Sequence, residues 1–161
     1  MTTMRRIADF ILQLALIFWL GGIFFFAVVM APATFQALDL IKDGDAFAPW
    51  IIAKGLFALH SLGLVCGGVY LIVSLVRYKQ VLRMAHLLIL VMMSLTLFSR
   101  LYITPRIEAA RTVVFRMSDL APTDPRRVEF DKWHRMSTIT EGLVFFLGLG
   151  VVFLGTKQEE G

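Results

Sequence analysis

The sequence predicts an all-α integral membrane protein, a bundle of four transmembrane helices in which helices three and four extend beyond the bilayer as a hairpin. The first observation is composition: of 161 residues, 58% are hydrophobic and 17% are charged, and the mean hydropathy is +0.75. Soluble domains carry about 25% charged residues. The polar side chains are too few to cover a water-facing surface, so much of the surface must face lipid.

The second observation is four apolar stretches that are long enough to cross a bilayer, since a core of about 30 Å needs about 20 helical residues. The uncharged run 142–155 is too short, and it must extend back to about Met136, which draws Glu141 into the membrane. The first stretch is longer than the h-region of a signal peptide, so we expect it to be retained. One membrane domain over 1–161 is therefore expected, with spans at about 10–33, 55–76, 84–103 and 136–156.

The segments around these spans contain further helix signals. Pro32, near the end of span one, is expected to kink the helix or to end it. The longest connection, 104–135, is predicted to form the protruding helical hairpin. Its second helix should begin at "DPRR", with Asp124 as N-cap and Pro125 at the first helical position.

Orientation rests on two opposed signals. The long connection and the first loop together hold nine Lys and Arg, against six on the side of the termini. However, the first span usually dominates, and Arg5 and Arg6 precede it. The second loop, 77–83, also packs three cations into seven residues. We therefore expect both termini in the cytoplasm and the protein in the cell membrane.

Polar residues inside the spans gather in one leaflet. His60 lies about 8 Å into span two, Arg100 about 5 Å from the end of span three, and Glu141 about 7 Å into span four. Because these ends lie on the same side, the three groups should have similar depth. Trp50, Tyr102 and Trp133 should form an aromatic belt there. His86 is expected near the opposite face.

Span four carries a polar stripe. His134, Ser137, Thr138 and Glu141 are spaced at 0, 3, 4 and 7 residues and so share one helical face. An ionised side chain at the bilayer centre costs roughly 2.5 to 3.5 kcal/mol on insertion scales. We therefore expect Glu141 to face the bundle, where Arg100 can neutralise it, either as a structural ion pair or as part of a site.

The remaining motifs limit the possible chemistry. Cys66 is the single cysteine, which excludes an internal disulfide and a cysteine-based metal site, and no basic run suggests nucleic acid. No cofactor or metal is expected. Gly63 and Gly67 form a GxxxG spacing, which favours close packing within the bundle or, alternatively, a homo-oligomer.

Three segments carry a family resemblance. "FWLGGIFFFAVVMAPATF" in span one, "TPRIEAAR" after span three and "FDKWHRMSTITE" entering span four resemble the transmembrane protein 205-like family, which bacteria share as domain of unknown function 4149. The resemblance covers nearly the whole chain and implies a four-helix membrane protein of unsettled biochemistry. The family pattern falls on seven positions of this sequence: Trp19, Gly22, Pro32, Pro105, Arg111, His134 and Ser137. The sequence departs from it at Glu141, where relatives often have asparagine.

Span one is also similar to the opening helix of the copper resistance D proteins and of the bacterial membrane protoporphyrinogen oxidase. This similarity implies an alternative, a haem-linked or redox membrane enzyme. His60 and His134 are the same-side pair that could supply two axial ligands. Copper is disfavoured, because there is one cysteine and no close cluster of His or Met.

The sequence thus favours a non-enzymatic multi-pass membrane protein. It is hypothesised to bind or pass a small polar or charged solute at a polar intramembrane site, or to act as an accessory membrane protein. A purely structural bundle is the remaining alternative. The hypothetical ligand-binding residues are His60, Arg100, Arg111, His134, Ser137 and Glu141.

Overall fold

The computed structural model describes residues 2–41, 47–78, 84–112 and 120–156, and the regular structure in these ranges is entirely helical. Four helical segments are long and apolar enough to cross a membrane. They are Thr3–Asp39, Ala48–Arg77, Met84–Arg111 and Pro125–Gly155. The predicted all-α membrane bundle is therefore confirmed. Trp19, Tyr70 and other residues of these segments are buried in the bundle, while many of their large apolar side chains remain exposed, as contact with lipid requires.

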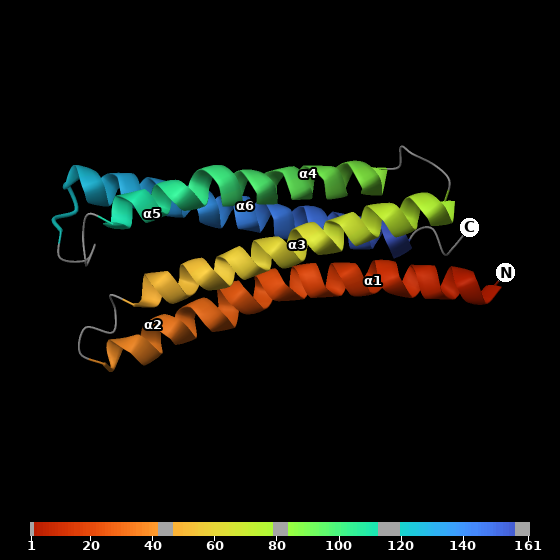
Figure 1. Ribbon diagram of the computed structural model, residues 1–161, viewed down its shortest axis with the longest axis horizontal. Coiled ribbons are helices and arrows are strands. Elements are labelled where there is room, and N and C mark those ends of the chain that lie inside the picture. The colour runs from red at the N-terminus through yellow and green to blue at the C-terminus, as the bar shows by residue number, and fades with distance from the viewer. Residues whose placement is uncertain (1, 42–46, 79–83, 113–119, 157–161) are drawn as a thin grey trace.

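The bundle consists of two helical hairpins with the same plan (Figure 1). In the first, α1 (Thr2–Phe25) leads through a π-helical turn, η1 (Phe26–Met30), into the short helix α2 (Ala31–Asp39), and α3 (Ala48–Tyr78) returns. In the second, α4 (Met84–Phe98) leads through η3 (Ser99–Ile103) into α5 (Thr104–Thr112), and α6 (Pro125–Thr156) returns. Helix α1 packs on α3 and α4 packs on α6, while contacts of α3 with α4 and of α1 with α6 join the hairpins.

Each π-helical turn precedes a proline. Pro32 and Pro105 are the second residues of α2 and α5. A proline inside a helix lacks the N–H for the bond to the residue four positions back, and its ring clashes with that carbonyl. The wider π turn avoids the conflict, because the amides of Ala31 and Thr104 bond five residues back, to Phe26 and Ser99. Pro32 therefore does not end the helix; the chain continues as α2.

The α5–α6 hairpin has the predicted start. Helix α6 begins at Pro125, and Asp124 Oδ1 accepts a hydrogen bond from the backbone N of Arg126 at 2.9 Å, as an N-cap should. The Arg126 guanidinium also donates to both carboxylate oxygens, at 3.0 and 2.8 Å. These hydrogen bonds from Arg126 lower the pKa of Asp124 to about 2. Asp124 is therefore a charged cap throughout the physiological pH range.

Glycines allow α1 to approach α3 closely. Trp19 is 2% exposed and lies against both Gly63 and Gly67. A Cβ on Gly63 would collide with the indole of Trp19, and one on Gly67 would approach Met93 Cγ to 2.7 Å and Trp19 Cζ3 to 3.0 Å. The GxxxG spacing thus packs the bundle internally, the first of the two roles expected for it, and a homo-oligomer through these glycines stays a prediction.

The opposite end of the bundle, where α1 begins and α3 ends, has its own polar contacts. Arg77 Nε donates to Asp9 Oδ1 at 3.3 Å and joins α3 to α1. His86, at the start of α4, is buried and lies 2.7 Å from Ser74 Oγ on α3. His86 therefore lies at the opposite end of span three from Ser99 and Arg100, as its position in the sequence predicted.

Candidate functional site

A large cavity opens at the end of the bundle that carries α2 and α5. Its volume is about 1450 Å³, and its walls come from the end of α1, from η1 and α2, from the first turns of α3, from α5 and from α6. Most of the lining is apolar. The apolar side chains include Ile23, Phe24, Phe26, Val28, Phe35, Phe47, Trp50, Ile52, Leu56, Leu59, Ile107, Phe130 and Phe145. In the view of Figure 1, α2 and α5 diverge at this end of the molecule.

The polar stripe of span four lines this cavity. His134, Ser137, Thr138 and Glu141, which the sequence placed on one helical face, all belong to the cavity wall. From His134 to Glu141 the helix rises about 10 Å, because each residue adds about 1.5 Å. The stripe therefore forms a polar strip on a mostly apolar surface.

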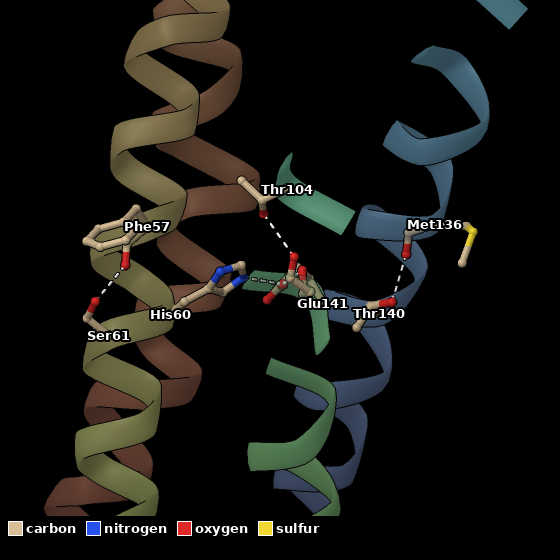
Figure 2. A network of polar contacts seen from close by, with 8 residues as sticks. Phe57, His60, Ser61, Thr104, Met136, Thr140 and Glu141 are labelled. Atoms are coloured by element: carbon tan, nitrogen blue, oxygen red, sulfur yellow. Dashed lines mark hydrogen bonds and ion pairs between the residues drawn. The ribbon is translucent and has the colours of Figure 1, made fainter. Parts of the chain in front are cut away.

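Glu141 is held at the deep end of the stripe by groups from two other helices. Its Oε1 lies 2.7 Å from His60 Nε2 on α3 and accepts a hydrogen bond from Ser99 Oγ, in η3, at 3.2 Å. Figure 2 shows the His60 ring reaching from α3 toward Glu141 on α6. His60 is 1% exposed and Ser99 is buried, whereas the Glu141 side chain is 16% exposed, so only Glu141 faces the cavity.

The expected partnership of Glu141 with Arg100 is wrong. Arg100 Nη1 donates instead to Ser61 Oγ at 2.9 Å, and its guanidinium stacks on the ring of Phe57 at 4.0 Å. Neighbouring residues of a helix point about 100° apart. Ser99 therefore faces Glu141, and Arg100 turns to the side of α3 that lies away from the cavity. The similar depth of His60, Arg100 and Glu141 was correct, but the direction of Arg100 was not.

Arg111 has a position in the cavity wall and a structural contact. Its Nη1 donates to the carbonyl oxygen of Pro49 at 2.9 Å, which ties α5 to the start of α3. Glu108, one turn earlier on α5, is close enough to interact electrostatically with Arg111. Sequence reasoning missed Glu108 and Asp39 as cavity residues, because their placement depends on how α2 and α5 diverge.

The two histidines of the haem alternative do not face one another. His60 Nε2 is engaged with Glu141 behind the cavity wall. His134 lies in the wall itself and stacks on Phe130, with ring centroids 5.9 Å apart and ring planes within 3°. Two axial ligands must present their nitrogens to one iron from opposite sides, and these side chains would have to reorient to do so.

The fold defines a multi-pass α-helical membrane protein with a cavity between its two hairpins. Residues 14–114 match the family described as "Domain of unknown function (DUF4149)", so the chain belongs to that family. No curated protein and no solved structure matches the chain. The matched region ends before α6, so the polar stripe from His134 to Glu141 lies outside it.

Proposed function

We propose that this protein binds an amphipathic molecule in the cavity between its hairpins, with the apolar part against the phenylalanine-rich walls and the polar part on the stripe of α6. The observation that carries the proposal is the combination of a cavity of about 1450 Å³ with a continuous polar strip on a mostly apolar lining. Ligand pockets typically measure about 300 to 1,000 Å³ and are mostly apolar, with a few polar groups that fix orientation. This cavity has room for a lipid-sized guest.

The mostly apolar lining favours an amphipathic ligand. The sequence had suggested a small polar or charged solute, and we replace that hypothesis with an amphipathic one. Transferring a polar group onto an apolar surface without a hydrogen bond costs free energy. A small polar solute would therefore use only the α6 stripe and leave most of the cavity unfilled. A guest with a hydrocarbon part also gains about 25 cal/mol for each Å² of apolar surface that it buries.

Access from the bilayer supports the same proposal. Phe24, Val28 and Phe35 line the cavity, and yet each remains half exposed or more, at 55%, 56% and 50%. Exposed apolar side chains on a helix long and apolar enough to cross a membrane are suited to contact with lipid. We propose that a guest enters from the lipid past this apolar edge of α1, η1 and α2, without crossing water. In the orientation expected from the sequence, with both termini in the cytoplasm, this entrance would lie in the outer leaflet.

The test compares two glycine variants in lipid nanodiscs. A Cβ on Gly142, in the cavity wall, and one on Gly68, outside it, would both meet nothing within 4 Å. Gly142→Phe should fill the polar end of the cavity, whereas Gly68→Phe should add the same side chain at a site outside the cavity. The readout is photolabelling by a long-chain alcohol that carries a diazirine, with and without excess unlabelled alcohol, and peptide mapping by mass spectrometry.

We expect competable labelling of cavity peptides from α2, α5 and α6 in the wild type and in Gly68→Phe. Gly142→Phe should lose most of it, while non-competable labelling of the lipid-facing surface stays the same in all three proteins. Equal competable labelling in Gly142→Phe and wild type would overturn the proposal. Native mass spectrometry of the same samples should show a co-purified lipid-like mass that only Gly142→Phe lacks.

A further inference from the structure

Only one of the two carboxylate oxygens of Glu141 is hydrogen-bonded to the described residues. Both of its hydrogen-bonding contacts among the described residues, from His60 and from Ser99, fall on Oε1. Oε2 has no partner there. Oε2 is also accessible. Among the described residues, Thr96 Oγ1 is the one side-chain polar atom that is both fully buried and without a hydrogen-bond partner. Since Glu141 lines the cavity, Oε2 is an acceptor offered to whatever occupies the cavity.

The donors behind Glu141 fix its orientation. An ionised carboxylate only accepts hydrogen bonds, and it has room for about four. His60 and Ser99 occupy one oxygen from the buried side and prevent the side chain from rotating away from the cavity. Oε2 therefore remains able to accept a hydrogen bond from a ligand in the cavity.

The other charged groups of the cavity do not supply that donor. Arg111 is directed to the Pro49 carbonyl and interacts with Glu108, so these two charges offset one another at the outer wall. The remaining charged lining residue, Asp39 at the end of α2, is exposed and is again acidic. Counted by formal charge, the described lining residues are therefore net negative around a mostly apolar space.

We infer that the cavity selects amphiphiles whose polar end is a protonated amine, held by Glu141 Oε2. This inference rests on the proposed function and specifies its ligand. An ammonium group supplies both the N–H donor and the positive charge, and it offsets the unfavourable placement of a carboxylate at membrane depth. Aromatic walls suit the same ligand, because a cation placed over a ring is attracted to its face. Phe130 and Phe145 lie on α6 on either side of the stripe along the chain.

The experiment uses two photoreactive probes with the same hydrocarbon chain, one ending in a primary amine and one in an alcohol, at a pH where the amine is protonated. Four proteins in nanodiscs are compared: wild type, Glu141→Gln, Glu141→Asp and Asp131→Asn. Asp131 is an exposed carboxylate of α6 that does not line the cavity, so its variant controls for the general charge of the helix. Competition by unlabelled dodecylamine and dodecanol gives the affinity of each head group.

Wild type and Asp131→Asn should prefer the amine about tenfold, as expected for one charge-assisted hydrogen bond. Glu141→Gln should reduce the preference to near one while still binding the alcohol, and Glu141→Asp should keep part of it. Retained alcohol binding shows that the glutamine variant is folded. Equal affinity for both probes in the wild type would overturn the inference but leave the proposed function standing. Absence of competable labelling by either probe would overturn both.

Discussion

At the scale of single residues, the site depends on which neighbour reaches Glu141. The sequence predicted correctly that His60, Arg100 and Glu141 lie at one depth, because depth follows from the helical rise alone. It could not predict the partner, because rotation of each helix about its axis decides that. At the start of η3, Ser99 rather than Arg100 reaches Glu141.

Two double-mutant cycles separate the observed partner of Glu141 from the one that was expected. Glu141→Gln is combined with His60→Ala in the first cycle and with Arg100→Leu in the second. The first should give a coupling free energy of about 0.5 to 2 kcal/mol, the range of hydrogen bonds within membranes and of contacting pairs. The second should be additive within about 0.5 kcal/mol, because Arg100 contacts Ser61 and Phe57 instead.

The measurement for both cycles is the free energy of unfolding in mixed micelles. A larger coupling free energy for Arg100 than for His60 would show that Glu141 pairs with Arg100, as the sequence suggested.

At the scale of elements, the proline-linked π turns shape the cavity. Both turns border the site: η1 contributes Phe26 and Val28 to the cavity wall, and η3 contributes Ser99 to the contact with Glu141. The prolines were visible in the sequence, and a distortion near Pro32 was expected. Its form was not, because a kink, an end and a π turn all relieve the same conflict and only packing selects among them.

Pro32→Ala should weaken binding without weakening the fold. The alanine restores the N–H and permits a regular α-helix, and the loss of the π turn would rotate α2 by about 100° relative to α1. Competable labelling of cavity peptides by the alcohol probe should fall several-fold, while the unfolding midpoint is unchanged or higher.

Pro125→Ala is the matched control for this change. Pro125 stands at the first position of α6, where a missing N–H breaks no helical bond, so both properties should stay at the wild-type value. Wild-type labelling in Pro32→Ala would mean that the π turn does not shape the cavity.

At the scale of the whole molecule, composition and span length were sufficient to predict the four-helix bundle, because both follow from the amount of apolar sequence and its length. The start of α6 was predicted from a local helix signal, the N-cap and proline of "DPRR". The cavity was not predicted, because it results from the divergence of α2 from α5 and α6. The stripe on α6 indicated only one of its walls.

Cysteine labelling in intact cells should establish the orientation. Single cysteines replace Thr3 and Thr123, both exposed at opposite ends of the bundle, in a Cys66→Ser background. With Arg5 and Arg6 holding the first span, a membrane-impermeant thiol reagent should label position 123 and spare position 3. Permeabilised cells, in which both positions should react, provide the control. Labelling of position 3 alone in intact cells would move the cavity to the cytoplasmic leaflet.

The hydrogen bond between His60 and Glu141 has a consequence for how the protein is made. His60 belongs to the first hairpin and Glu141 to the second, so neither has its partner until both hairpins are in the membrane. A first hairpin on its own presents an imidazole without this partner, and α6, which is synthesised after it, carries a carboxylate that is unfavourable in lipid on its own. Formation of this contact gives the imidazole its partner, engages Oε1 of the carboxylate and adds a polar link to the packing between the hairpins. A chain that stops before α6 lacks this contact, so its first hairpin keeps a histidine without this partner in the membrane.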